Sequence, residues 1–295
     1  MRALVRDVKR AHFLAQSGVS LITGSLEDPA SLARLVTGVD AVVHCAGSVR
    51  GIDLADFERV NVEGLRRIVA ATRAASDHAD TPSRLLCLSS LAAREPGLSH
   101  YAASKRHGED LLANEGAGLE WVALRPPAVY GPGDKELLPL FRWMQRGLAP
   151  IVGDRSGRFS MLYVDDLAAA IETWLSKGHG VTGVFELDDG HDNGYSWDEL
   201  VAIAAQQRGG RVFALPISGG VLRMVAGINL AVARLAGYAP MLSPGKVREL
   251  RHPDWCCDNG PWRELVPWRP EIEFAEGLDR TLKSYPVCDR VSGAP

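Results

Sequence analysis

Tyr101 and Lys105 are the residues of this sequence whose types and spacing suit proton transfer. They stand four positions apart at the start of a helix predicted over 101–114, so both side chains lie on one face. A phenol is a poor acid or base near neutrality, because its unperturbed pKa is about 10. A neighbouring ammonium favours the phenolate and brings a phenol toward the working range of a general acid/base. The pair therefore indicates proton transfer at an alcohol or a carbonyl.

Two hydroxyls, Ser89 and Ser90, follow a predicted strand over 85–88, just before the helix that carries Tyr101. A serine hydroxyl at a strand end could hydrogen-bond the same substrate oxygen that receives the proton. The Tyr-x-x-x-Lys spacing alone fits equally well a surface tyrosine that packs over a lysine stem. The functional interpretation therefore depends on the elements around the pair.

Strands and helices alternate through the first 190 residues, which predicts a parallel sheet covered by helices on both faces. Asp28 is the expected N-cap of one helix, with Pro29 at its first position. Pro126 and Pro127 end the strand over 119–124 and leave a fixed loop at its carboxyl end, where open α/β sheets bind ligands. The predicted strands cover 3–6, 19–23, 40–44, 85–88, 119–124 and 184–187, and the predicted helices cover 8–16, 30–36, 61–75 and 101–114.

The pattern changes after Gly190 to helices and irregular segments, so we expect two domains, 1–190 and 191–295. The segment 161–168 is expected to be a short strand that leads into a helix, for which Asp165 or Asp166 is the expected N-cap. Ser196 and Glu199 have the spacing of a capping box at a later helix. We interpret the second part as a smaller, mainly helical substrate-binding region.

The composition is that of a soluble globular enzyme, with 46% apolar and 23% charged residues in 295. The net charge of −3 gives no electrostatic footprint for nucleic acid. Five cysteines without C-x-x-C spacing favour reduced thiols in a cytoplasmic protein, and the vicinal pair Cys256 and Cys257 has no partner at metal-ligand spacing. We therefore expect a cytoplasmic protein with no metal site.

The most apolar late segment covers 217–238, but Arg223, Asn229 and Arg234 interrupt it. These polar residues argue against a transmembrane segment and favour an amphipathic helix. Its apolar face could line a greasy substrate pocket, touch a membrane surface or pack against the protein, and packing is the default expectation. The opening residues also lack an apolar run long enough for a signal peptide.

Several segments together resemble one family. Ser90, Tyr101 and Lys105 occur in order with NVEG at 61–64, RPPAVYGPG at 125–133 and VDDLA at 164–168. This combination resembles the extended branch of the short-chain dehydrogenase/reductase superfamily, which includes NAD(P)-dependent epimerases, dehydratases and 3β-hydroxysteroid or dihydroflavonol-type reductases. The resemblance implies a Rossmann-type, doubly wound parallel sheet over residues 2 to 190.

The resemblance also implies roles for single residues. Tyr101 would be the acid/base, Lys105 would hold the ribose hydroxyls, and Ser90, rather than Ser89, would orient the substrate oxygen. Ala46 and Gly47 would line the cofactor pyrophosphate or ribose, and the backbone at Pro126 would meet the nicotinamide.

Three further positions have less direct counterparts in the family. Asn61 matches a helix asparagine near the site, although a hydrogen bond at a helix end explains it equally well. His44 and Tyr130 are expected to serve the scaffold. The interval from Ser90 to Tyr101 is shorter than in sugar-nucleotide epimerases, so the resemblance does not transfer a specific substrate.

The family begins with a strand, a G-x-x-G-x-x-G turn and a helix, and this sequence contains no such turn. In the family that turn holds the pyrophosphate on backbone amides at a helix N-terminus. The expected explanations are a reading frame that begins upstream or a remnant that holds cofactor poorly, and we favour the first. If the chain instead begins at Met1, the strands over 3–6 and 41–44 are expected either to flank a gap where the central strand belongs or to close up and pair directly. A version extended upstream is expected to bind dinucleotide better.

Arg6 ends the first predicted strand, where an arginine suits the 2′-phosphate of NADP and an acid would suit NAD. We therefore predict NADP as the preferred cofactor, or NAD. A homodimer is expected through the helices over 61–75 and 101–114, whose alanines would allow close approach, although packing within one subunit would use them equally well.

Three functions remain open. The leading hypothesis is an oxidoreductase that acts on a secondary alcohol or carbonyl by hydride transfer. An epimerase or dehydratase with retained cofactor would use the same site. A non-catalytic nucleotide-binding remnant would use the scaffold alone.

Overall fold

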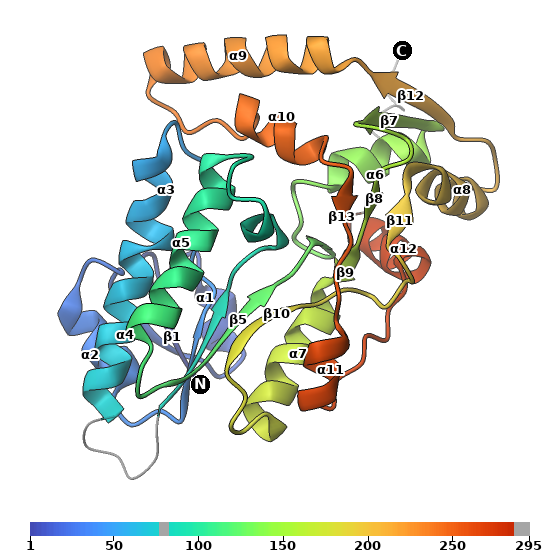
Figure 1. Cartoon of the computed structure of the whole chain (residues 1–295). Helices are drawn as coiled ribbons and strands as arrows, with labels where there is room; N and C mark the ends of the chain where they lie inside the picture. Colours follow the sequence, from blue (N-terminus) through green and yellow to red (C-terminus); the bar gives the residue numbers. More distant parts are fainter. Residues whose placement is uncertain (77–82, 286–295) are drawn as a thin grey trace, which may run out of the picture. The chain divides into compact units, whose positions relative to one another are not determined.

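Parallel strands that alternate with helices build the first part of the chain, as the sequence pattern predicts (Figure 1). The computed structural model describes residues 1–76 and 83–285. Two compact units divide these residues: the first holds 1–125, 175–185 and 226–249, and the second holds the remainder. Each unit consists of three segments that alternate along the chain, so neither unit corresponds to a continuous stretch of sequence. The expected functional division at residue 190 stays a prediction.

Four strands of the first unit form a sheet in the order β10-β5-β4-β3, in which β3 pairs with β4 and β4 with β5 in parallel. Strands β1 and β2 form a separate parallel pair. The elements are β1 (Arg2–Val5), α1 (His12–Gln16), β2 (Ser20–Thr23), α2 (Pro29–Val36), β3 (Ala41–His44), α3 (Leu54–Asn61), α4 (Glu63–Ser76), β4 (Arg84–Leu88), the 3₁₀ helix η1 (Leu91–Arg94), α5 (His100–Glu115), β5 (Glu120–Arg125), β10 (Gly183–Glu186) and α10 (Pro244–Leu250). The predicted α/β fold with a parallel sheet is confirmed.

Strands β1 and β3 belong to different sheets and share no ladder within 1–76 and 83–285. The alternative that these two strands close up and pair directly is therefore wrong. In a doubly wound sheet of order 3-2-1-4-5-6, β2 and β1 take the places of strands 3 and 2, and β3 takes the place of strand 4. The expectation that β1 and β3 stand on either side of the central strand's place stays a prediction.

The core of the first unit lies between the sheet and helices α2, α4 and α5. Leu32 of α2, Leu65 and Ile68 of α4, and Leu112 of α5 are buried against Leu85 of β4. Helices α2 and α4 contribute side chains at three- and four-residue spacing, which gives each one apolar face, and α5 contributes the adjacent Leu111 and Leu112. This packing fixes α5, the helix that carries Tyr101 and Lys105, against the strands.

The chain between 54 and 76 forms two helices where one was predicted from Asn61 onward. Asp53 caps α3 by accepting a hydrogen bond from the Asp56 amide, and α3 ends at Asn61. Helix α4 then begins at Glu63. The expected start at Asn61 is therefore wrong, because that residue closes the preceding helix.

The alanines expected to face a dimer partner are divided between two environments. Ala71 and Ala75 pack against the core of their own subunit, and Ala102 is buried. Ala70 and Ala74 are exposed on α4. The homodimer stays a prediction.

The second unit consists of short strands and helices around an aromatic core. Its elements are β6 (Ala128–Tyr130), α6 (Leu138–Gln145), β7 (Leu148–Val152), β8 (Arg158–Phe159), β9 (Met161–Tyr163), α7 (Val164–Lys177, to Trp174 in this unit), β11 (Tyr195–Ser196), α8 (Trp197–Arg208), β12 (Phe213–Ile217), β13 (Asp254–Trp255), α11 (Gly260–Leu265) and α12 (Phe274–Ser284). Strand β6 pairs with β9, and β7 with β12, both in parallel.

Tyr130 lies at the centre of this aromatic core. Its ring contacts Phe141, Tyr163 and Phe274 at centroid distances of 5.7, 5.5 and 5.5 Å. A Cβ at Gly277 would lie 2.3 Å from the Tyr130 hydroxyl oxygen, so only glycine fits there. Tyr130 is packed among aromatic rings, as expected for a residue that serves the scaffold.

Asp166 does not cap a helix, in contrast to the expectation for Asp165 or Asp166. Helix α7 already begins at Val164, which places both aspartates in its first turn. The buried carboxylate of Asp166 instead accepts hydrogen bonds from the amides of Glu271 and Ile272, each at 3.0 Å. The side chain that the local pattern assigned to a helix cap therefore binds backbone amides more than 100 residues away in the sequence.

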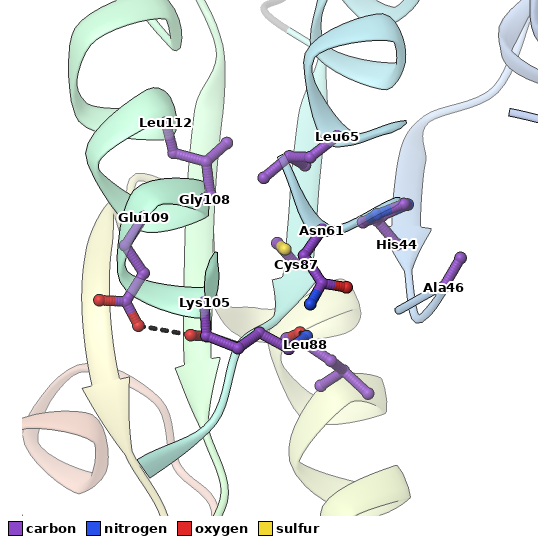
Figure 2. A pocket seen from close by; sticks show the side chains of 11 residues that line it. His44, Ala46, Asn61, Leu65, Cys87, Leu88, Lys105, Gly108, Glu109 and Leu112 are labelled. Carbon is purple, nitrogen blue, oxygen red and sulfur yellow. Dashed lines mark hydrogen bonds between the residues drawn. The ribbon is translucent and has the colours of Figure 1, made fainter. Parts of the chain in front are cut away.

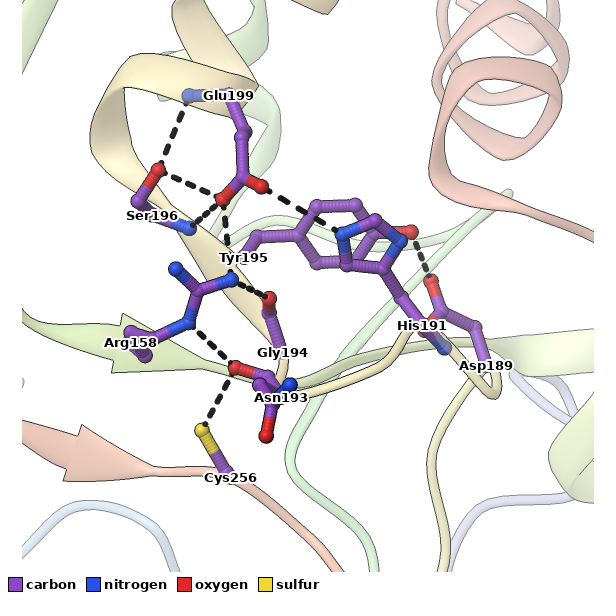
Figure 3. Close-up of polar contacts among 9 residues, drawn as sticks. All are labelled: Arg158, Asp189, His191, Asn193, Gly194, Tyr195, Ser196, Glu199 and Cys256. Atoms are coloured by element: carbon purple, nitrogen blue, oxygen red, sulfur yellow. Dashed lines mark hydrogen bonds and ion pairs between the residues drawn. The ribbon is translucent and has the colours of Figure 1, made fainter.

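The capping box predicted at α8 is confirmed. The Ser196 hydroxyl caps the Glu199 amide, and the Glu199 carboxylate accepts from the Ser196 amide at 2.6 Å (Figure 3). Beside it, the His191 ring stacks on Tyr195 at 4.0 Å, and the Tyr195 hydroxyl donates to Asp189 at 2.7 Å. Burial raises the pKa of Asp189 to about 6.

Candidate active site

The ends of β3 and β4 and the first turns of α5 meet around the ammonium of Lys105 (Figure 2). Lys105 Nζ donates to the Leu88 carbonyl at 2.8 Å, where β4 ends. A Cβ at Gly47, just beyond β3, would lie 3.2 Å from the same nitrogen. The lysine therefore reaches the carboxyl edge of the sheet, which is the ligand-binding edge of this fold.

Tyr101 stands one helical turn before Lys105 on α5. Its ring contacts Phe57 of α3 edge-on at a centroid distance of 6.2 Å, and Lys246 Nζ of α10 lies 5.9 Å from the ring centroid. Both neighbours orient the phenol and were not predicted, because neither is close to Tyr101 in sequence. Tyr101 and Lys105 are both half-buried, so a ligand can reach each side chain.

The two serines after β4 have different environments. Ser89 is buried, and its hydroxyl donates to the Glu109 carboxylate. Ser90 is half-buried, and its oxygen accepts from the Ala92 amide at 3.2 Å as the N-cap of η1. This arrangement engages Ser89 in the scaffold and Ser90 in the cap of η1, and the catalytic role of Ser90 stays a prediction.

Asn61 fixes the loop that contains Ala46 and Gly47. Its side-chain oxygen accepts from the Ser48 amide at 2.7 Å, and its nitrogen donates to the Ser48 carbonyl at 3.0 Å and to Ser104 Oγ at 2.9 Å. The asparagine thereby ties the loop after β3 to helix α5. Sequence spacing marked Asn61 as a residue near the site, but its two partners follow only from the fold.

A buried ion pair joins β5 to α5 below the site. Arg125 donates to Glu109 through Nε at 2.9 Å and through Nη2 at 2.6 Å, and the Glu109 side chain is 4% exposed. The two parallel hydrogen bonds form the bidentate geometry that orients both groups. The Ser89 hydroxyl shares the same carboxylate, so β4, β5 and α5 are held together at one point.

His44, the last residue of β3, lies next to this site and is uncharged at neutral pH. Burial, reinforced by the positive charge of Lys105, lowers the pKa of His44 to about 4. Its Nε2 atom has no hydrogen-bond partner among the residues that the structure describes. Cys87 pairs with His44 across the ladder, and burial raises the pKa of its thiol to about 11.

The predicted cofactor residues occupy both units. Ala46 and Gly47 are exposed at the end of β3, and Arg6 is exposed directly after β1. Pro126 follows β5 and is the first residue of the second unit. The structure thus brings Ala46, Gly47 and Lys105 together at one sheet edge, and Tyr101 stands one helical turn from Lys105 on α5.

The residues at this edge fit the sugar of a nicotinamide dinucleotide. A Cβ at Gly47 would also lie 3.3 Å from Asn61 Oδ1, so the missing side chain keeps the space above Lys105 open. The ammonium carries three donors, and the Leu88 carbonyl is its one hydrogen-bond acceptor within 1–76 and 83–285. The remaining donors suit paired sugar hydroxyls.

Within the described segments, no group of three or more His, Cys, Asp or Glu side chains has the arrangement of a metal site. The four cysteines there, Cys45, Cys87, Cys256 and Cys257, form no disulfide bond with one another, and Cys288 lies outside the described residues.

Solved structures with a similar fold include two enzymes in complex with NAD. The dTDP-glucose 4,6-dehydratase DesIV of Streptomyces venezuelae, with NAD bound, has a TM-score of 0.68 at 21% identity over 96% of this chain and 86% of its own. The Bordetella bronchiseptica enzyme WbmG, in complex with NAD and UDP, has a TM-score of 0.65 at 20% identity over 91% and 80%. At these identities the likeness shows the fold.

Sequence comparison gives nearer relatives. The chain is 38% identical to ceramide reductase of Caulobacter vibrioides over 96% of its length and 86% of the relative. It is 34% identical to 2-alkyl-3-oxoalkanoate reductase of Stenotrophomonas maltophilia over 55% of its length and 54% of the relative. Residues 1–185 match the description of the NAD dependent epimerase/dehydratase family. The resemblance inferred from the sequence is confirmed, and with it the prediction of an enzyme that uses a nicotinamide cofactor: the chain belongs to the NAD dependent epimerase/dehydratase family.

Proposed function

We propose that this chain is an NAD(P)-dependent reductase of a ketone on a long-chain lipid, with Tyr101 as the general acid. The observation that carries the proposal is the placement of Lys105 at the ends of β3 and β4, one helical turn from Tyr101 on α5. This puts a proton donor beside a cation at the ligand-binding edge of the sheet.

Each residue has a separate task in this proposal. Tyr101 gives its proton to the carbonyl oxygen of the substrate, and water later restores that proton. Ser90 donates a hydrogen bond to the same oxygen and holds it against the phenol. Lys105 binds the ribose hydroxyls with the donors that the Leu88 carbonyl does not use, and its charge stabilises the phenolate that remains.

A nicotinamide dinucleotide, when bound, supplies the hydride that reduces the substrate carbon. Ala46 and Gly47 would line its sugar-phosphate side and Pro126 would meet its nicotinamide. Asn61 would act as a positioning residue, because it holds the 46–48 loop through both polar groups of Ser48.

The proposed substrate class rests on the two relatives named as reductases, one of ceramide and one of a 2-alkyl-3-oxoalkanoate. Both names describe substrates with long or branched alkyl chains, and the second names a ketone at the third carbon. An epimerase or dehydratase is the second candidate for the same site, but the two enzymes in complex with NAD resemble this chain in fold alone.

The test compares Tyr101→Phe with the unmodified chain in the NADPH-dependent reduction of a long-chain 3-oxo amide, followed by nicotinamide absorbance. We expect turnover to fall by at least about 100-fold while cofactor affinity changes little, because general acids contribute about 10²–10⁴. Tyr238→Phe removes a hydroxyl from an exposed tyrosine that hydrogen-bonds Asn229, and it should keep normal turnover.

Retention of most activity in Tyr101→Phe would remove the assignment of the general acid. A purified chain that retains its cofactor and gives no net turnover with added nucleotide would favour the epimerase or dehydratase. A chain that binds dinucleotide but converts neither class of substrate would favour the non-catalytic alternative.

A further inference from the structure

Helix α9 (Gly219–Ala236) exposes its bulky apolar side chains to solvent. Leu235 is 90% exposed, Met224 60% and Ile228 58%. The exposed positions recur at spacings of three and four residues, so they form one continuous face of the helix. We call this face the apolar stripe, and it consists of Val221, Met224, Val225, Ile228, Val232 and Leu235.

The other sides of α9 carry its more buried residues, namely two alanines and the half-buried Leu222, Asn229 and Leu230. Ala226 and Ala233 are fully buried. The Asn229 side chain donates to the Leu242 carbonyl at 2.8 Å and accepts from the Tyr238 hydroxyl at 2.6 Å. A helix that packs into a protein core normally buries its large apolar side chains, so the default expectation of packing is wrong for this helix.

The charge of the surrounding segment distinguishes between possible partners. Residues 200–248 contain no aspartate or glutamate, whereas the whole chain has a net charge of −3. The same segment contains six basic residues, of which Lys246 pairs with Glu249 at 2.8 Å and the other five are Arg208, Arg211, Arg223, Arg234 and Arg248. In a dimer formed through this face, α9 of one copy would meet the same acid-free segment of the other copy, which carries no excess of negative charge. Anionic lipid headgroups supply negative charge, and each basic residue near their surface contributes about 1 kcal/mol to binding.

Strand β12, which leads into α9, adds apolar exposure within the same acid-free segment. Phe213 and Leu215 are both more than half exposed. They stand two residues apart in a strand, so their side chains lie on one face. Aromatic and aliphatic side chains next to a basic apolar helix are typical of segments that insert into the headgroup region of a bilayer.

We propose that α9 is an interfacial helix that docks the protein on an anionic lipid bilayer, with the apolar stripe at the acyl boundary. By length and composition α9, with a mean hydropathy of 1.3 over 18 residues, could also cross a membrane. Arg223, Asn229 and Arg234 are costly at the centre of a bilayer, and Ala226 and Ala233 already bind the helix to the protein. The helix therefore lies in the plane of the interface. This inference is independent of the proposed reductase activity.

The test is co-sedimentation of the full chain with vesicles of phosphatidylcholine, alone or with about 30 mol% phosphatidylglycerol. We expect binding to the anionic vesicles, with the bound fraction falling as salt screens the attraction. Little binding is expected without phosphatidylglycerol. A chain that stays in the supernatant with anionic vesicles overturns the proposal.

The apolar stripe is tested by Leu235→Gln and by Ile228→Gln combined with Leu235→Gln. The double variant should lower the vesicle partition coefficient by about tenfold or more, since each side chain loses most of its apolar burial. Leu265→Gln on α11 is the matched control, because it changes an exposed leucine outside the stripe and should bind normally. Leu235→Gln alters a side chain that is almost fully exposed, so this variant should fold normally. Weaker vesicle binding by Leu235→Gln would therefore support the proposal without the double variant.

Equal vesicle binding by Leu235→Gln, the double variant and the unmodified chain would overturn the assignment of the stripe. Light scattering separates the remaining alternative. If the unmodified chain ignores vesicles and the double variant changes its mass from dimer to monomer, the stripe is a self-association surface and the proposal is wrong.

Discussion

The carboxylate of Glu249 in α10 accepts a hydrogen bond from the hydroxyl of Ser99, which is the N-cap of the helix that carries Tyr101. Ser99 Oγ at the same time accepts from the Ala102 amide at 3.0 Å. The second carboxylate oxygen of Glu249 pairs with Lys246 Nζ at 2.8 Å, and this lysine lies over the Tyr101 ring. Helix α10 thereby holds the first turn of α5 from a position 150 residues later in the chain.

Removal of this contact should affect both stability and turnover. In Ser99→Ala, loss of the cap costs about 1 kcal/mol. The buried Glu249 also loses a partner, which costs about 1–3 kcal/mol more. Denaturant unfolding should report the sum, and turnover should fall by about tenfold because Tyr101 lies in the first turn of the helix.

Ser196→Ala provides the matched control for that variant. It removes the N-cap of α8 in the second unit, where the partner Glu199 is exposed enough to be solvated. Stability should fall by about 1 kcal/mol with turnover unchanged. Ser99→Thr, which keeps the hydroxyl, should restore most of the turnover. Equal effects of the two alanine variants on turnover would show that Ser99 acts on stability alone.

Lys105→Met should lower both turnover and dinucleotide affinity, in contrast to Tyr101→Phe. The variant keeps the apolar stem but removes the donors for the ribose and the charge beside the phenol. Hydrogen bonds to a charged group contribute about 1.5–3 kcal/mol, so affinity should fall by about 10- to 100-fold. Titration calorimetry gives the affinity and steady-state kinetics give the turnover. Lys135→Met, at an exposed lysine outside the site, should change neither quantity.

Arg6 is predicted to select NADP over NAD through the 2′-phosphate. Arg6→Ala should weaken NADPH binding by about tenfold or more and leave NADH binding nearly unchanged, because only the first cofactor carries that phosphate. The two affinities are measured by titration calorimetry. Arg10→Ala is the control, since Arg10 is exposed and near Asp7. Equal affinities in the unmodified chain, or a preference that survives in Arg6→Ala, would contradict the prediction.

His44 and Asp189 should make the free energy of unfolding depend on pH in opposite directions. The folded pKa of His44 is lowered to about 4 from 6.5, so its contribution is complete above pH 6.5 and is lost as the pH falls toward 4. The folded pKa of Asp189 is raised to about 6 from 3.8, so its contribution is complete below 3.8 and is lost as the pH rises through 6. Each change corresponds to about 3 kcal/mol at full effect.

Two variants separate these contributions by unfolding in denaturant between pH 4 and 7. Relative to the unmodified chain, His44→Leu should become more stable as the pH falls, because a buried imidazole no longer takes up a proton. Asp189→Asn should become relatively more stable as the pH rises, because a buried carboxyl no longer ionises. Differences of the same sign for both variants, or differences independent of pH, would contradict the assignment of these pKa shifts.

Local spacing determined much of the site and of the secondary structure. Tyr101 and Lys105 share a face because any α-helix brings residues four apart together, wherever the helix is placed. The Asp28 cap, the box at Ser196 and Glu199, and the alternation that predicts a parallel sheet are likewise short-range properties, and the structure contains all three. Interactions between near neighbours can be read from sequence because the chain has few ways to arrange them.

The contacts that orient this site were decided by tertiary structure. Asn61 reaches Ser48 and Ser104, Glu249 reaches Ser99, and no spacing in the sequence specifies these pairs. Asp166 illustrates the same limit, since a residue suited to a helix cap is used for two distant amides. The amphipathic pattern of α9 identified its apolar face, but only the fold showed that this face points outward. A periodic pattern defines which side chains share a face, whereas the path of the whole chain decides what that face meets.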